Sequence, residues 1–199
     1  VEDDAVPDDV LGHGTHVAGI VAAQANNGVL GSGVAPDCGI LPLRVLDASG
    51  WGDTLDLGDA IYRATDQGVD VINMSLGTSE QSTYVSDAVA YAIAHDVVVV
   101  AAAGNVYLPK YPRLPDVQYP AREPGVIAVG AIQNTSPYTI ASFSQDGAGL
   151  DVVAPGAYIF STVIGTTGAY WDGTSMATPF VAGAAALMRT VVPGATQAD

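Results

Sequence analysis

The segment Val97–Ala103, with the sequence VVVVAAA, limits the possible folds of this chain more than any other stretch. A strand with one face in water alternates apolar and polar residues, whereas this run is apolar at every position. Continuous apolar character is typical of a parallel strand that is covered on both faces. The run is also far shorter than the ~20 apolar residues needed to cross a bilayer. It therefore predicts a buried strand of a parallel sheet.

Segments with the period of a strand alternate along the chain with segments that have the period of a helix. The expected strands are Gly39–Leu46, Val69–Met74, Val97–Ala103, Val126–Ala131 and Asp151–Val153. The expected helices are His16–Gln24, Leu55–Gln67, Tyr84–His95 and Met176–Val191. Val106–Glu123, rich in Pro and Tyr, is expected to be a long surface loop. This order predicts an α/β fold: a doubly wound, mostly parallel sheet with helices on both faces, which binds ligands at the carboxyl ends of its strands.

Length and composition exclude several classes of protein. A chain of 199 residues with 49% hydrophobic and 14% charged residues can bury the core of one domain and is too apolar to be disordered. Its formal net charge of −15 repels phosphate, so we expect neither nucleic acid nor an anionic membrane as a partner. The single cysteine, Cys38, rules out an internal disulfide and a cysteine-based zinc site.

The first residues do not form a signal peptide, because Val1–Asp9 is acidic and lacks an apolar segment. The chain begins with Val1 rather than with Met, so we expect the true N-terminus to lie upstream.

Two histidines, His13 and His16, stand just before an apolar helical segment. Their spacing could place both on one helix face as metal ligands, but the metalloprotease pattern has an i, i+4 pair that encloses a Glu, and no third ligand is evident. A histidine at this place is often no more than part of a helix cap. Glycines on both sides of His13, however, allow another chain to approach it closely, as a general base requires. His13 is therefore a candidate base.

Ser175 lies at the start of the segment expected to form the last helix. A serine at a helix start usually caps the helix. Here Pro179 falls in the first turn, where a missing N–H costs nothing, and the helix end is left free to face a ligand. A hydroxyl at this end lies in the positive field of the helix, and backbone N–H groups nearby can hold an oxyanion. Ser175 is therefore a candidate nucleophile.

Asn105 follows Gly104 directly after the buried run Val97–Ala103. Asn after Gly is most often a turn residue. At the carboxyl edge of a parallel sheet, its side-chain amide would also be placed to meet a developing negative charge. His13, Asn105 and Ser175 together indicate acyl-transfer chemistry more strongly than any of them alone.

These residues stand in blocks that resemble the subtilisin family of serine proteases, the subtilases. The blocks follow one another in the family's order and span nearly the whole chain: HGTHVAG (His13–Gly19), NMSLG (Asn73–Gly77), VVVVAAAGN (Val97–Asn105), the stretch from Tyr119-Pro120 to VIAVGA (Val126–Ala131), DVVAPG (Asp151–Gly156) and GTSMATP (Gly173–Pro179).

The resemblance implies a serine endopeptidase that works through an acyl-enzyme. His13 would be the general base, Ser175 the nucleophile and Asn105 a side-chain donor to the oxyanion, together with the N–H of Ser175. Further positions would bind the polypeptide substrate. Ser75, Leu76 and Gly77 would pair with its backbone as an added strand, and Ala102, Ala103 and Gly104 would form one wall of the pocket for the residue before the cut.

Gln118 stands at the base of that pocket, where relatives often carry a small residue. We therefore expect a shallower and more polar pocket than in open-pocket relatives. The resemblance also leads us to expect a cis peptide bond between Tyr119 and Pro120, which only proline makes inexpensive.

One part of the family pattern is missing. The family's catalytic Asp lies on an early strand, in an Asp-Ser/Thr-Gly setting some thirty residues before the histidine. None of the early carboxylates Asp3, Asp4, Asp8 and Asp9 has that setting. We therefore interpret residues 1–199 as a partial peptidase catalytic domain, a single domain truncated at both ends. The parent would be the protease, and this chain alone would be inactive and poorly folded.

The resemblance also bears on cofactors, partners and location. No cofactor is expected for the chemistry. The loop with Asn26 and Asn27 resembles a family calcium loop, so structural calcium is an expectation for the parent, while a plain Asn-Gly turn explains the same residues equally well. We expect a polypeptide substrate, a monomer and secretion.

Two other functions compete with proteolysis. A relative that no longer cleaves could keep the groove as a peptide-binding module, although such drift should alter at least one of His13, Asn105 and Ser175. An unrelated doubly wound domain could bind a small ligand, but Asp47–Gly52 lacks the spacing of a phosphate-binding glycine loop.

Overall fold

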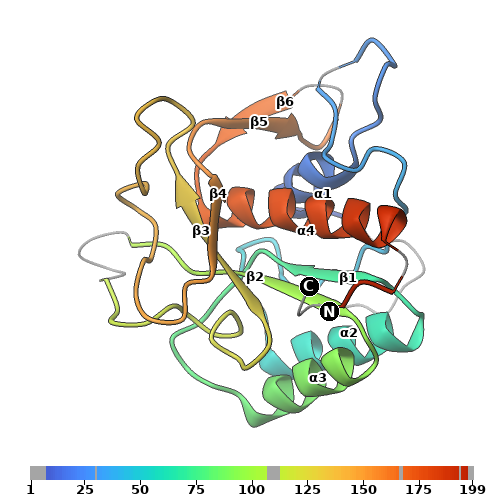
Figure 1. The fold of residues 1–199 in the computed structure, drawn as a ribbon, viewed down its shortest axis with the longest axis vertical. Helices are drawn as coiled ribbons and strands as arrows, with labels where there is room; N and C mark the ends of the chain where they lie inside the picture. Colours follow the sequence, from blue (N-terminus) through green and yellow to red (C-terminus); the bar gives the residue numbers. More distant parts are fainter. Residues whose placement is uncertain (1–7, 30, 107–112, 166–167, 193, 197–199) are drawn as a thin grey trace.

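Strand β2 (Val98–Ala102) lies inside a parallel sheet of four strands, as its apolar run predicts. The computed structural model describes residues 8–29, 31–106, 113–165, 168–192 and 194–196. Within them the sheet has the order β1-β2-β3-β4, with β1 at Val71–Met74, β3 at Ile127–Ile132 and β4 at Val152–Pro155 (Figure 1). Every neighbouring pair is parallel, for example Val71 beside Val98 and Val129 beside Val152.

Helices cover both faces of this sheet (Figure 1). On one face lie α2 (Thr54–Asp66) and α3 (Thr83–Ala94), which also pack against each other. On the other lies α4 (Thr174–Val191), with α1 (His13–Ala22) packed against it. The fold class predicted from the sequence is confirmed, and the helix boundaries lie close to those expected.

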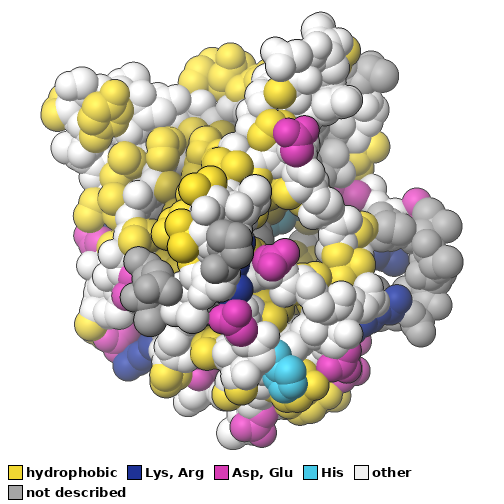
Figure 2. All heavy atoms as spheres, turned by 45° about the vertical axis from the view of Figure 1, so that its right-hand side comes forward, with side chains coloured by type: hydrophobic (Ala, Val, Ile, Leu, Met, Phe, Trp, Pro, Cys, Tyr) yellow, Lys and Arg dark blue, Asp and Glu magenta, His cyan; other side chains and the backbone are white. Residues whose placement is uncertain are grey.

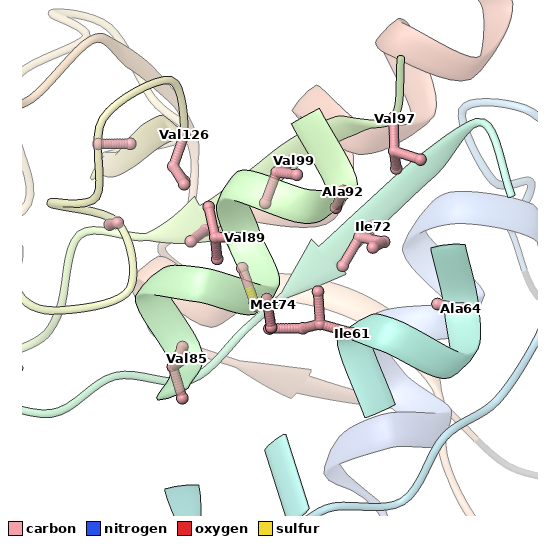
Figure 3. Close-up of a cluster of buried hydrophobic side chains, with 14 of the residues drawn as sticks. Ile61, Ala64, Ile72, Met74, Val85, Val89, Ala92, Val97, Val99 and Val126 are labelled. Carbon is pink, nitrogen blue, oxygen red and sulfur yellow. The ribbon is translucent and has the colours of Figure 1, made fainter. Parts of the chain in front are cut away.

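The core has one layer on each face of β2, because consecutive residues of a strand point to opposite faces. Val99 packs with residues of α2 and α3 such as Ile61 and Val89, as Figure 3 shows. Val100 packs with Ala177 and Ala182 of α4. Both valines are fully buried, which explains why the strand has no polar position.

An antiparallel hairpin, β5 (Ile159–Thr162) and β6 (Gly168–Trp171), was not expected from the sequence. Its side chains bind the carbonyl groups of α1: the Ser161 hydroxyl donates to His16 at 2.7 Å and the Thr162 hydroxyl to Thr15 at 2.8 Å. The hairpin thereby joins the start of α1 to the segment that leads into α4.

The prediction of a strand at Gly39–Leu46 is wrong for this structure. That segment forms no ladder, and Ile40 and Leu41 are 45% and 39% exposed. A strand exists only when a neighbour completes its hydrogen bonds, and β1 is the edge strand of the described sheet. The apolar sequence is that of a strand, but no partner strand lies beside it in the part of the chain that the structure describes.

A groove of about 960 Å³ lies between β1 and this segment. Leu41 and Leu43 line it on one side and Ile72 and Met74 on the other, and His13 lines it as well. Figure 2 brings forward the side of the molecule that carries β1 and α1, and hydrophobic side chains are exposed on it among scattered acidic ones. An open edge of a parallel sheet beside an apolar groove is unusual, because parallel strands are normally covered.

Part of the loop expected at Val106–Glu123 lies outside the described residues, at positions 107–112. In the remainder, the backbones of Thr78 and Tyr119 exchange hydrogen bonds of 2.8 and 2.9 Å, and the Tyr119–Pro120 bond is cis, as expected. Among the described residues, no helix combines the length and the apolar character that spanning a bilayer requires.

Candidate active site

The carboxylate of Asp9 fixes the position of His13, the first residue of α1. One oxygen of Asp9 accepts the N–H groups of Leu11 and Gly12 at 3.0 and 2.7 Å. The other accepts the N–H and the hydroxyl of Thr15, both at 2.7 Å. These bonds satisfy donors at the start of the helix, which would otherwise be unpaired. The same hydrogen bonds favour the charged form of Asp9. Burial by itself raises the pKa of this carboxyl, but the donors from Thr15, Gly12 and Leu11 have the larger combined effect. The pKa of Asp9 therefore lies below its usual value.

Burial favours the neutral form of the His13 imidazole. Burial lowers its pKa below the usual value; the nearby Asp9 charge opposes this shift, and His16 adds to it. The ring faces that of Trp171 on β6, with centroids 6.4 Å apart. A histidine that is neutral at pH 7 can accept a proton, as a general base must.

Ser175 is the second residue of α4, at the positive end of that helix. Its hydroxyl donates to the carbonyl oxygen of Ser75 at 3.1 Å, and the hydroxyl of Ser75 donates back to the carbonyl oxygen of Ser175 at 2.8 Å. The N–H of Ser175 lies in the first helical turn, where no acceptor within the helix is available. It is therefore free to meet an oxygen of a ligand.

Asn105 stands just beyond the end of β2 and is oriented by the start of α4. Its side-chain oxygen accepts the N–H of Thr174 at 2.9 Å and the Thr174 hydroxyl at 3.1 Å. Because the side-chain oxygen of Asn105 faces Thr174, its amide nitrogen Nδ2 points away from Thr174. It would lie 3.7 Å from a Cβ atom built on Gly173. The side-chain N–H of Asn105 and the backbone N–H of Ser175 thus come from two elements that meet at one place.

His13, Asn105 and Ser175 line a single pocket of about 520 Å³. The structure therefore brings together the three residues that the sequence indicated as base, oxyanion donor and nucleophile. Because the Ser175 hydroxyl donates to Ser75, it must rotate before its proton can pass to His13. The arrangement has the groups needed for acyl transfer: a hydroxyl, a neutral imidazole and two N–H donors.

His16 has a structural role rather than that of a metal ligand paired with His13. Its ring is fully buried and lies flat on Trp171, with centroids 4.5 Å apart and planes at 4°. Its Nε2 lies 3.1 Å from the carbonyl oxygen of Ala169 on β6. Burial lowers its pKa. In the described residues no group of three or more His, Cys, Asp or Glu side chains is placed to hold a metal ion.

Gln118 occupies the space beside two glycines of the expected substrate-binding set. A Cβ atom on Gly104 would lie 2.5 Å from the Gln118 amide, and one on Gly77 would lie 2.8 Å from its Oε1. Ala102 and Ala103 are buried at the end of β2, and the half-buried Leu76 packs against the core cluster that the sheet forms with α2 and α3.

Four residues of the pocket are not predicted as site residues from the sequence: Tyr170, Trp171, Asp172 and Met176. The first three directly precede the GTSMATP block and Met176 lies within it, so their closeness to Ser175 could have been inferred from the sequence. The first three are not predicted because the two short strands of the β5–β6 hairpin are not recognised in the sequence.

The loop with Asn26 and Asn27 forms a turn. Asn26 has a φ of 58°, and the Asn27 side-chain oxygen accepts the N–H of Val29 at 2.9 Å. The turn interpretation explains both features. Structural calcium at this loop stays a prediction.

The sequence model described as the Subtilase family matches residues 1–199. The chain belongs to the subtilase family. Among curated subtilases and related proteases, it is 47% identical over 188 residues to the thermophilic serine proteinase of Bacillus sp. (strain AK1), and 48% identical over 183 residues to subtilisin DY of Bacillus licheniformis. These alignments cover 94% and 92% of this chain, but only 45% and 65% of the two relatives.

Solved structures agree with this assignment. The subtilase chain superposes on sphericase with a TM-score of 0.84 at 34% identity, and on the S41 psychrophilic protease with a TM-score of 0.85 at 36% identity. Each superposition covers 94% of this chain and 66% of the other. The chain thus spans about half to two thirds of the length of its relatives.

The Asp9→Asn substitution tests the electrostatic part of this site. Because the Asp9 charge stabilises the imidazolium form, its removal should lower the pKa of His13 further below the usual value. Titration of the His13 ring followed by NMR measures this shift directly. Asp8→Asn changes an exposed neighbouring carboxylate and serves as the control. A His13 pKa that rises in Asp9→Asn, or falls equally in both variants, would contradict the assignment.

Proposed function

We propose that the whole protein is a serine endopeptidase that hydrolyses peptide bonds through an acyl-enzyme. The observation that carries this proposal is the single pocket lined by His13, Asn105 and Ser175. The family assignment supports it, since the relatives bear the names of proteases. A secreted monomer that acts on polypeptides stays our expectation for the whole protein.

The chemistry follows from the groups in the pocket. The Ser175 oxygen attacks the carbonyl carbon of the substrate while His13 takes the hydroxyl proton. The oxyanion that forms accepts hydrogen bonds from Asn105 Nδ2 and from the N–H of Ser175. His13 then gives its proton to the departing amine, which leaves an ester on Ser175. Water, activated by His13, hydrolyses that ester and restores the serine.

The substrate backbone would lie along Ser75–Gly77, directly beyond β1. An extended peptide can pair with such an edge as an added strand. The carbonyl of Ser75 already accepts a hydrogen bond from Ser175, so a peptide on this edge would run past the nucleophile. Gln118 then meets the side chain before the cut and makes its pocket shallower and more polar.

A carboxylate to support protonated His13 is the remaining requirement of this mechanism. We propose that a further extended strand of the whole protein fills the groove beside β1 and supplies it. Two observations support this. First, His13 lines the groove as well as the catalytic pocket. Second, Asn73 also lines the groove, and its side-chain oxygen is buried without a hydrogen-bond donor in the described structure. The charge of Asp9 raises the pKa of His13, but both Asp9 oxygens already accept hydrogen bonds at the start of α1, so we do not assign Asp9 as the carboxylate that binds the imidazole.

A peptide-binding relative that does not cleave is the competing function. It requires the strand edge at Ser75–Gly77 but neither a nucleophile nor a base. No feature of the pocket favours it over catalysis, and the first experiment below separates the two.

Reaction of the whole protein with a phosphonofluoridate tests Ser175 as the nucleophile. We expect one adduct, on Ser175, with loss of peptidase activity, because this hydroxyl shares its pocket with a neutral imidazole. Ser175→Ala should abolish both labelling and cleavage, whereas Ser136→Ala, at an exposed loop position, should leave both unchanged. Peptide mass spectrometry locates the adduct. Binding of peptides without any labelling or cleavage would favour the non-catalytic function.

The Gln118→Gly substitution tests the pocket for the residue before the cut. Removing the side chain that lies beside Gly77 and Gly104 opens space, so kcat/KM for substrates with Phe or Leu before the cut should rise by about tenfold or more. Substrates with Ala at this position, which do not reach the new space, are the internal control. Equal changes for Phe and Ala substrates would contradict the assignment of Gln118.

A polypeptide limited to residues 1–199 should be inactive and poorly folded. Without the carboxylate beside His13, kcat should fall by about 10⁴, a magnitude measured for serine proteases including subtilisin. The open edge of β1 should also cause self-association. Kinetics and light scattering on this polypeptide and on the whole protein make the comparison. An active, monomeric product of residues 1–199 would contradict the proposed role of the groove.

A further inference from the structure

The β5–β6 hairpin, together with the residue directly before β5, displays three exposed aromatic rings, those of Tyr158, Phe160 and Tyr170, which we call the aromatic platform. Their residues are 63%, 39% and 53% exposed. Tyr158 stacks on Tyr170 with centroids 4.1 Å apart and planes at 12°, and Phe160 packs on Tyr170 at 5.0 Å. Phe160 and Tyr170 are also directly paired across the two strands. A contiguous exposed apolar patch of this kind usually marks a binding surface.

The aromatic platform is continuous with the catalytic pocket. Tyr170 belongs to both, since it lines the pocket together with His13 and Ser175. Asp172, which also lines the pocket, accepts the backbone N–H of Tyr158 at 2.6 Å. A peptide that leaves the pocket past Tyr170 therefore meets the aromatic platform next.

The backbone of Tyr158 is held in an unfavourable conformation. Its φ is 55°, in the left-handed region that bulky side chains rarely adopt. Two contacts maintain it: the bond from its N–H to Asp172 and the bond from the Asn134 amide to its carbonyl oxygen, at 3.2 Å. Strain that the surrounding structure maintains is often found at binding sites. Here the strained residue is the one whose ring lies flat on Tyr170.

The place of the aromatic platform relative to Ser175 decides which part of a substrate it meets. On one side, Ser175 is hydrogen-bonded to Ser75, where the proposed function places the part of the substrate before the cut. Tyr170 and Asp172 line a different surface, together with His13, and Ser75 does not belong to it. His13 delivers its proton to the departing amine, so the segment after the cut leaves on this side.

We propose that the aromatic platform is a subsite for a large apolar side chain of the departing segment, located beyond the residue that directly follows the cut. This inference rests on the proposed function. Aromatic rings bury large areas and add specific ring contacts, so Phe or Leu in the substrate should bind better than Gly. The carboxylate of Asp172 at the rim, on a chain of net charge −15, should disfavour Asp at the same place.

The test uses internally quenched peptides that are identical up to the cut and carry Ala directly after it. Phe, Leu, Gly or Asp then follows at the second or third place. For the whole protein, kcat/KM should be about three- to tenfold higher with Phe than with Gly, and lowest with Asp. A short peptide ester with a small alcohol as leaving group does not reach the aromatic platform and reports the chemistry alone.

The double variant Tyr158→Ser with Phe160→Gln should lose the preference for Phe and keep the rate on the ester. Tyr138→Ser removes a tyrosine that is 69% exposed and lies outside the aromatic platform, so it should keep the preference. A Phe preference that is absent in the unmodified protein, or retained in the double variant, overturns the assignment.

Failure of the proposed function gives a different result. If neither the ester nor any peptide is cleaved, calorimetry with the same peptides and Ser175→Ala protein still measures the aromatic platform. Tighter binding of the Phe peptide that disappears in the double variant supports it, and equal binding of all peptides refutes it.

Discussion

The hydrogen bonds between the Asn105 side-chain oxygen and Thr174 join the two parts on which the site depends. Asn105 lies just beyond the end of β2, the most deeply buried strand, and Thr174 begins the helix that covers one face of the sheet. Because β2 is packed on both faces, its carboxyl end is held firmly in place. The hydrogen bonds to Thr174 therefore fix the positions of Ser175 and of the Asn105 amide relative to the end of β2. His13 reaches the same pocket from a separate element, α1, which the hairpin β5–β6 ties into place.

Elements with complete local signals could be predicted from the sequence. The run Val97–Ala103 indicated a buried parallel strand, and helix α2 begins where Asp53 caps it, with its oxygen accepting the N–H of Leu55 at 2.7 Å. Gly39–Leu46 has the same kind of local signal and is not a strand, since strand formation depends on a neighbour that local sequence does not report. The hairpin at Ile159–Trp171 is the opposite case, because the sequence does not predict its short strands although they form. Contacts with α1, which lies far away in the sequence, stabilise it.

The residues of the site also divide into those that short sequence motifs predict and those whose role only the folded structure shows. Short motifs located His13, Asn105 and Ser175, and the structure brings all three to one pocket. The role of Asp9 was not predicted, because its contacts to Leu11, Gly12 and Thr15 arise from the turn that the chain makes before α1. Tyr158 is the clearest example of a feature that the sequence does not predict. Its left-handed backbone and its stacking on Tyr170 are set by Asp172 and Asn134, and no local pattern indicates either.

In the proposed function, His13 and Ser175, 162 positions apart in the sequence, act on the same substrate carbonyl. A peptidyl chloromethyl ketone tests it most directly, since the serine oxygen adds to its carbonyl carbon and the histidine nitrogen displaces its chloride. Both bonds can form on one inhibitor molecule only if the two side chains face the same spot. A crystal structure of the inhibited whole protein should show a single inhibitor bonded to Ser175 Oγ and to His13 Nε2, with its oxygen beside Asn105. An inhibitor bonded to neither residue, or to one with the other facing away, would contradict the account.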